Sequence, residues 1–218
     1  MGQICSLGIS PFIMRSTESL ISIVLNRGLQ IYGGDLYVGS LTIMQSVLQL
    51  FSAPLSGFTQ GVQPIISYNY GAGNFDRVKK LYRRMIGISF AISFTANLTA
   101  MLFPGIYAAL FTNDQELIGL VSRVMPVFLF GMLFFGLQNG IQPTFLALGQ
   151  ARISLFIAMF RKVILLVPLA LVLPRFFGVM GIYYAEPVSD LISAATAGIL
   201  FGINIKKILS KEYLARIQ

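Results

Sequence analysis

The sequence predicts an all-α integral membrane protein with six transmembrane helices. Of its 218 residues, 56% are hydrophobic and 11% are charged, and the mean hydropathy is +0.77. A soluble domain is about 25% charged, so this chain has more apolar surface than a water-soluble core of its size can bury. A transmembrane helix needs about 20 mostly apolar residues, and the chain has room for six. No long segment alternates polar and apolar residues as the strands of a membrane β-barrel do.

Six helical stretches are predicted, with turn-forming residues between them. They cover about residues 7–32, 37–66, 78–111, 117–148, 153–176 and 179–205, and a basic tail follows over residues 206–218. Glycine, asparagine and aspartate cluster at the breaks, as in Gly33-Gly34-Asp35 and Gly71-Ala72-Gly73-Asn74. Such clusters are typical of turns between helices. The six stretches form a single transmembrane unit over residues 1–218.

Charges in the connections predict the orientation of this unit. Basic residues are concentrated in the second connection, the fourth connection and the tail: Arg77, Lys79, Lys80, Arg83, Arg84, Arg152, Lys206, Lys207, Lys211 and Arg216. The other connections carry Asp35, Asp114, Glu116 and a single Arg175. Because cytoplasmic loops carry an excess of Lys and Arg, both termini of this multi-pass protein are predicted to be cytoplasmic. The net charge of +8 is therefore assigned to membrane orientation, and no nucleic-acid partner is expected.

The composition also argues against catalytic and metal chemistry. The chain has no histidine, which is the commonest general base, and its single cysteine, Cys5, excludes an internal disulfide and a cysteine-based metal site. No Ser/Lys or paired-Asp arrangement stands out at a suitable depth. We therefore expect neither an enzyme nor a bound cofactor or metal.

Polar residues recur every three or four positions on the apolar helices. In hydrocarbon such groups lack partners, so they are expected to face one another or a wet cavity. Small and polar residues also hold membrane helices together, and for the Ser and Thr members that explanation stays open. The amides are assigned to a substrate cavity: Asn26, Gln45, Gln49, Gln63, Gln138 and Gln142. Gln63 and Gln142 lie in a weak internal repeat, residues 60–64 (QGVQP) and 139–143 (NGIQP).

Glu18 is the candidate ion-coupling residue. It lies about 11 residues into the first helix, or roughly 16 Å along it, near the middle of a hydrocarbon core about 30 Å thick. A charge at that depth costs about 2.5–3.5 kcal/mol on insertion scales, so it needs a partner, a proton or a function. Arg15, one turn earlier, could form a structural ion pair with it. Alternatively, Glu18 couples ion movement to transport.

Further charged partners are predicted on the last two helices. Arg161 and Lys162 begin about eight residues into the fifth helix, too deep for a loop. Lys162 could extend to the cytoplasmic interface, whereas Arg161 could pair with a carboxylate. Glu186 and Asp190 are four residues apart on the sixth helix, and they form either a second carboxylate site or part of the external interface.

The chain resembles the MATE (multidrug and toxic compound extrusion) transporters over essentially its whole length. Residues 57–74, GFTQGVQPIISYNYGAGN, resemble the most characteristic stretch of that family, which ends the eighth span and opens the next cytoplasmic loop. The resemblance continues through Arg161, Pro168 and Pro174, and through residues 178–183 (GVMGIY) and 187–190 (PVSD). The chain resembles MepA-like members of the family, and this resemblance implies a plasma membrane location, the inner membrane of bacteria. Family members have twelve spans in two six-helix lobes, and this chain resembles the C-terminal lobe.

The resemblance implies antiport of cationic, amphipathic drugs or toxins in exchange for protons or sodium ions. In sodium-type members a glutamate of the seventh span follows a glycine by ten residues, and Gly8 and Glu18 have that spacing. The tenth-span aspartate of those members has no counterpart, and Gln138 lies near its place. The sequence therefore leaves both ions open.

The resemblance also implies partners and leaves two alternative functions. Besides the lipid bilayer and a small cationic substrate, the expected partner is an N-terminal six-helix lobe or a second copy of the chain. One alternative is a flippase for lipid-linked substrates, although the mixed and mostly neutral cavity differs from the basic cavities of such carriers. The other alternative is a truncated membrane fragment that is inactive in transport.

Overall fold

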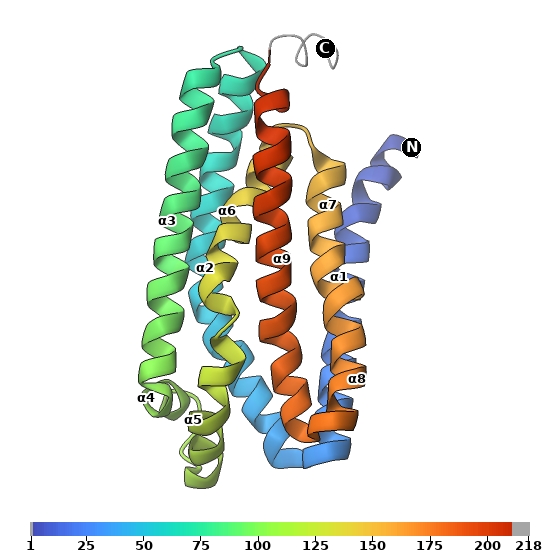
Figure 1. The fold of residues 1–218 in the computed structure, drawn as a ribbon, viewed down its shortest axis with the longest axis vertical. Coiled ribbons are helices and arrows are strands. Elements are labelled where there is room, and N and C mark those ends of the chain that lie inside the picture. The colour runs from blue at the N-terminus through green and yellow to red at the C-terminus, as the bar shows by residue number, and fades with distance from the viewer. Residues whose placement is uncertain (1, 211–218) are drawn as a thin grey trace.

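The protein is a bundle of long, roughly parallel helices (Figure 1). The computed structural model describes residues 2–210, with side chains from residue 17 onward. Its elements are α1 (Gly2–Gly33), α2 (Asp35–Gly71), α3 (Phe75–Leu102), α4 (Pro104–Ala109), α5 (Gln115–Leu129), α6 (Met132–Ala147), α7 (Ala151–Met159), the π-helix η1 (Phe160–Leu166), α8 (Val167–Phe177) and α9 (Val179–Ile208). Within residues 2–210 the regular structure is helical throughout, and the prediction of an all-α protein is confirmed.

Several of these helices are long and apolar enough to cross a membrane. Among the described residues they are α2, α3, the continuous run Ala151–Phe177 and α9, and the pair α5 and α6 counts as a fifth if it is one bent span. The exposed outer surface fits this setting, because large apolar side chains such as Ile164, Phe176 and Ile203 lie on it. An all-α membrane bundle is therefore what the sequence forms.

Two of the predicted helical stretches are interrupted. The third stretch was expected to continue to Phe111, but α3 ends at Leu102 and the short α4 follows. Pro104 explains this end, because proline lacks an N–H group and disfavours helical geometry at the preceding residue, here Phe103 with φ −126° and ψ 50°. The fourth stretch is divided into α5 and α6, which are bent by 49° at Phe130–Gly131.

Glycines on α6 bring this helix close to its neighbours. A Cβ atom on Gly140 would lie 2.7 Å from Ile86 Cα of α3, and one on Gly136 would lie 2.7 Å from the Ser89 carbonyl oxygen. Gly136 and Gly140 are four residues apart and so lie on the same face of α6. Small residues at this spacing let membrane helices approach closely. Just before α6, a Cβ on Gly131 would lie 2.5 Å from Pro187 Cα, so α9 also packs against the bend.

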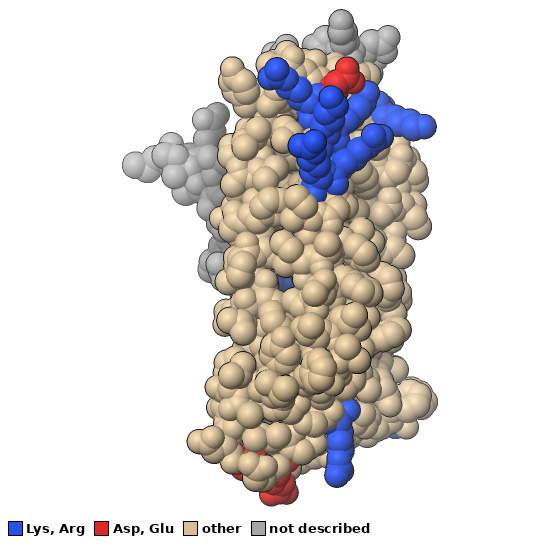
Figure 2. Space-filling model, turned by 90° about the vertical axis from the view of Figure 1, so that its left-hand side faces the viewer, with Lys and Arg blue, Asp and Glu red and all other residues tan. Residues whose placement is uncertain are grey.

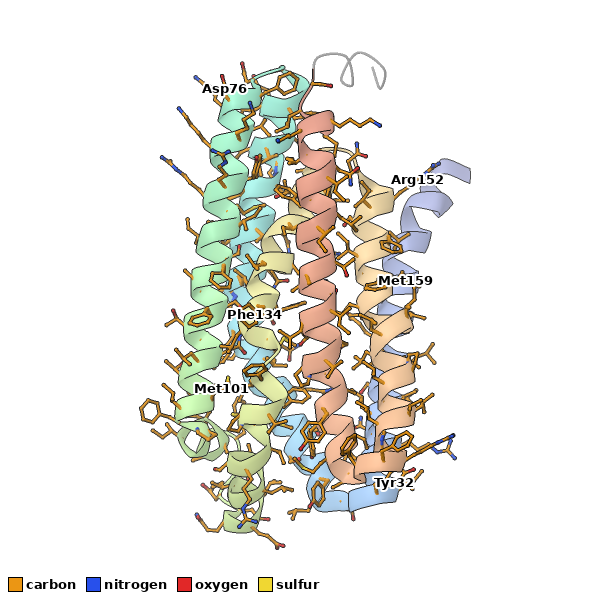
Figure 3. The ribbon with its side chains drawn as sticks, in the orientation of Figure 1. Tyr32, Asp76, Met101, Phe134, Arg152 and Met159 are labelled. Atoms are coloured by element: carbon orange, nitrogen blue, oxygen red, sulfur yellow. The ribbon has the colours of Figure 1, made fainter. Side chains whose placement is uncertain are left out.

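Basic side chains are concentrated at one end of the bundle. The start of α1, the end of α9 and the α2–α3 connection all lie at that end (Figure 1). Figure 2 shows the cluster of Lys and Arg side chains there, which on α3 comprises Arg77, Lys79, Lys80, Arg83 and Arg84. Asp76 and Arg152 mark this end in Figure 3, and Tyr32 marks the opposite end. The charge asymmetry expected from the sequence is thus an asymmetry between the two ends of the bundle.

Candidate functional site

A cavity of about 520 Å³ is formed between the helices. Its wall includes residues of α1, α2, α3, α6, η1 and α9, and it combines amides, carboxylates and bases with apolar side chains. The polar and charged members are Glu18, Ser22, Thr42, Gln45, Ser46, Gln49, Ser52, Ser93, Asn97, Asn139, Arg161, Lys162 and Glu186. Six helical segments therefore contribute to one polar cavity, whereas the amides assigned to a substrate cavity lie on only three of the predicted stretches.

The predicted amide residues are divided among three environments. Gln45 and Gln49 line the cavity, whereas Gln63 and Gln142 line a second hollow of about 230 Å³. Asn139 lies on the wall of both hollows, so the two adjoin. In the part of the chain described here, Asn26 and Gln138 line neither hollow. Asn26 donates to Ser22 Oγ at 3.2 Å, and Gln138 accepts from Ser193 Oγ at 2.8 Å between α6 and α9.

Glu18 lies on the cavity wall and pairs with a lysine from a distant part of the chain. Lys162 Nζ donates to Glu18 Oε1 at 2.6 Å, which joins η1 to α1. The Glu18 side chain is 46% exposed and that of Lys162 is 24% exposed, so the pair is accessible from the cavity. The side chain of Arg15, the partner suggested by the sequence, lies outside the described residues.

Arg161 binds both carboxylates of α9 in a buried cluster, called here the Arg161 cluster (Arg161, Glu186 and Asp190). Its Nη2 donates to Glu186 Oε1 at 3.2 Å and its Nε donates to Asp190 Oδ1 at 2.5 Å. The guanidinium also lies over the ring of Phe135, 4.3 Å from the ring centroid. Arg161 and Glu186 reach the cavity wall, and Asp190 is fully buried. The sequence-predicted partners Arg161, Glu186 and Asp190 therefore come together at one place.

The π-helix η1 carries both basic residues of the site. Its two consecutive residues Arg161 and Lys162 pair with different helices, α9 and α1. Short π-helical turns are rare and occur often at functional sites. The Glu18–Lys162 pair was not predicted from the sequence, which left open that Lys162 extends to the cytoplasmic interface. The only available signal was the presence of two adjacent charges deep in an apolar helix.

Polar residues of α3 complete the wall. Asn97 Nδ2 donates to the carbonyl oxygen of Ser93 at 2.8 Å, and this bond fixes the orientation of the amide. Asn97 Oδ1 is buried and has no hydrogen-bond partner in the described structure. Across residues 2–210, no group of three or more His, Cys, Asp or Glu side chains is placed to hold a metal ion.

The fold and the site define a polytopic α-helical membrane protein with a charged, polar cavity between its helices. Residues 12–172 match the MatE family, which is about three quarters of the chain. The chain belongs to the MatE family.

Individual relatives agree with this assignment. The chain is 25% identical over 198 residues to the multidrug export protein MepA of Staphylococcus aureus (strain MSSA476), covering 90% of this chain and 43% of that protein. It is 24% identical over 220 residues to MepA of Staphylococcus haemolyticus, covering 100% of this chain and 48% of that protein. The chain thus spans about half the length of the curated relatives it matches.

Solved structures show the same fold. A MATE protein in the bent conformation superposes with a TM-score of 0.85 at 19% identity, over 95% of this chain and 46% of that one. An inward-facing multidrug resistance MATE family transporter of the MOP superfamily has a TM-score of 0.85 at 20% identity, over 94% of this chain and 48% of that one. The resemblance to the MATE lobe expected from residues 57–74 is therefore confirmed at the level of family and fold.

Proposed function

We propose that this chain is one six-helix lobe of a secondary antiporter that exports cationic, amphipathic compounds in exchange for protons or sodium ions. The observation that carries this proposal is the cavity of about 520 Å³ with the carboxylates of Glu18 and Glu186 on its wall. The relatives named multidrug export protein support the same direction. Solved family members in outward-facing and inward-facing conformations support an alternating-access cycle.

The chemistry of the wall suits an amphipathic cation. Phe51, Met132 and Phe135 supply apolar and aromatic surface, and methionine adapts readily to ligands of different shape. Aromatic rings also attract cations through their faces. Gln45 and Gln49 add amide groups that hydrogen-bond polar parts of a ligand. The second hollow, with Gln63 and Gln142, extends this surface towards the basic end.

Glu18 is proposed as the ion-coupling carboxylate. It faces the cavity, and its present ionic partner is the ammonium group of Lys162 at 2.6 Å. A cation or proton that binds Glu18 weakens this ion pair and so changes the contact between α1 and η1. Differential binding of this kind is what shifts a transporter between two conformations.

The working transporter is proposed to contain a second lobe, either an N-terminal six-helix lobe or a second copy of this chain. Transporters of this kind bind substrate near the middle of the bilayer, between two repeats. We place the protein in the bacterial inner membrane because relatives such as MepA of Staphylococcus aureus are bacterial membrane transporters by family. The positive-inside rule supports placing its basic end and both termini in the cytoplasm.

Substrate efflux from proteoliposomes tests the proposal. Vesicles carrying this chain, alone and together with an N-terminal lobe, are loaded with a fluorescent cationic dye and given a proton or sodium gradient. We expect gradient-driven dye movement when both lobes are present, and its loss in Glu18→Gln. The matched control is Glu116→Gln, because Glu116 is exposed outside the cavity at the start of α5. Absence of dye movement with both gradients and both lobes would contradict the antiporter function.

A further inference from the structure

The Arg161 cluster contains one more carboxylate than it has bases. Arg161 supplies one positive charge, and Glu186 and Asp190 supply two negative charges when both are ionised. All three side chains are buried, with 7%, 8% and 0% of the residue surface exposed. A buried net charge is unfavourable inside a membrane unless something neutralises it. The cluster is therefore one positive charge short.

Each carboxylate of the cluster also has one oxygen without a partner. Arg161 contacts Glu186 Oε1 and Asp190 Oδ1, whereas Glu186 Oε2 and Asp190 Oδ2 are shielded from solvent and accept no hydrogen bond in the described structure. Buried polar atoms in proteins are nearly always hydrogen-bonded, so an unpartnered pair on neighbouring residues calls for an explanation. The missing charge and the missing donors occur at the same two side chains.

The groups around the cluster do not supply the missing charge. From η1 and α1 the neighbouring charged groups are Lys162 and Glu18, which bind each other at 2.6 Å. On α6, the ring of Phe135 lies against the guanidinium of Arg161. At the bend between α5 and α6, Gly131 packs against Asp190. On α9 itself, the phenol of Tyr183 is turned to Ser40, 2.6 Å away. The polar residues of α3 on the same cavity, Ser93 and Asn97, are uncharged.

We propose that the Arg161 cluster binds one proton, shared by Glu186 and Asp190, at a site separate from Glu18. A proton on a free carboxylate oxygen removes the excess charge and turns an unpartnered acceptor into a donor. A metal ion at the same oxygens would lie beside the guanidinium, whose charge repels it. The proton site deepens the proposed function, on which its role in transport rests, because it gives the antiporter a proton-binding group apart from Glu18.

The position of the two carboxylates assigns the route of the proton. Glu186 lies on the cavity wall, whereas Asp190 is fully buried behind it between η1 and the bend at Gly131. Exchange with the cavity therefore goes through Glu186, and Asp190 stays within the protein. A proton that leaves restores the negative charge beside Arg161 and strengthens the attraction between η1 and α9.

Infrared spectroscopy of the purified chain in lipid nanodiscs at neutral pH tests the site. A protonated carboxyl group has a carbonyl band that a carboxylate lacks and that shifts in D₂O, and ordinary exposed carboxyl groups are ionised at this pH. We expect the band in the wild-type protein. Both Glu186→Gln and Asp190→Asn should lose it, because the one remaining carboxylate is then neutralised by Arg161.

The control variant is Glu18→Gln, which should keep the band in full. The proposal is wrong if the wild-type protein lacks the band, if both single variants retain it, or if Glu18→Gln removes it. Loss of the band when sodium replaces choline in the buffer would mean that a metal ion takes the site, and would also overturn the proposal. The wild-type spectrum needs neither a variant nor transport, so dye efflux without the band would leave the proposed function standing and reject only the proton site.

Discussion

At the scale of single residues, Arg161 holds most of the buried charge in place. It is the guanidinium partner of Glu186 and Asp190, and it also packs on the ring of Phe135. Arginine suits this position because its planar group donates in several directions at once and stacks on aromatic rings, neither of which lysine does as well. Removing one partner of a buried ion pair leaves an uncompensated charge, which costs more than the pair itself contributes.

Arg161→Met is therefore predicted to be strongly destabilising. We expect the free energy of unfolding to fall by about 3–5 kcal/mol, and Arg161→Lys to recover only part of that loss. Thermal unfolding of the purified variants in detergent measures the effect. Arg152→Met is the matched control, since Arg152 is exposed near the basic end and its loss should change stability by no more than about 0.5 kcal/mol. Equal stability of the Arg161→Met and Arg152→Met variants would refute the prediction.

Part of the site could be predicted from single residues. Glu18, Arg161, Glu186 and Asp190 stand out because a charge within an apolar stretch is costly, and that reasoning needs no structure. The partners could not be predicted in the same way. Lys162 and Glu18 are 144 positions apart, and their pairing depends on which faces of α1 and η1 meet. Gln138 was assigned to the substrate cavity for its polarity, but in the described structure it bonds to Ser193 between two helices.

At the scale of elements, the close contact of α6 with α3 depends on glycine. Gly140 is buried against the backbone of Ile86, and there is no room for even a methyl group between them. Gly87, the next residue on α3, is exposed, and a Cβ added to it meets nothing within 4 Å. The two glycines lie on the two packed helices α3 and α6 but differ in what an added side chain would meet.

Gly140→Ala is predicted to push α6 away from α3. We expect a loss of about 1–3 kcal/mol in the free energy of unfolding, which is typical of overpacking. Gly87→Ala should instead be neutral or stabilising by up to about 1 kcal/mol, because alanine is the better helix former. Comparing the unfolding temperatures of both variants with the wild-type value tests the pair. A similar fall in both would show that glycine flexibility, and not close packing, is what matters.

The ends of helices could be predicted where glycine or proline determines the backbone geometry. Apolar stretches and the glycines of the Gly33-Gly34 turn indicate where α1 and α2 meet, and Gly34 has a positive φ of 80° that glycine adopts freely. The interruption after Leu102 follows from Pro104, although one helix was expected over residues 78–111. The π-helix over Phe160–Leu166 was not predicted, although Pro168 follows it by two residues and removes a backbone hydrogen-bond donor there.

At the scale of the whole molecule, the two ends of the bundle differ in charge. Arg77, Lys80, Arg83 and Arg84 are exposed on α3 at the basic end, whereas Asp114 and Glu116 are exposed at the opposite end. An excess of basic residues next to transmembrane helices keeps that end in the cytoplasm. The sequence therefore predicted not only the class of protein but also a direction across the bilayer.

Thiol labelling in intact cells tests this direction. In a Cys5→Ser background, Asn74→Cys lies in the turn at the basic end and Asn113→Cys lies between α4 and α5. A membrane-impermeant maleimide should label Asn113→Cys in intact cells, and Asn74→Cys only after the cells are permeabilised. Both positions are exposed, so accessibility of the side chain does not bias the comparison. Labelling of Asn74→Cys in intact cells would show the reverse orientation.

The adjacency of Arg161 and Lys162 has a mechanical consequence for the lobe. Arg161 forms an ion pair with α9 and Lys162 forms one with α1, so two consecutive residues of η1 link these two helices. Because the two residues are adjacent, a rotation of η1 that separates Lys162 from Glu18 also moves Arg161 relative to the carboxylates of α9. The seven-residue π-helix thus connects the two ion pairs, and we expect a change at the pair with α1 to alter the contact with α9.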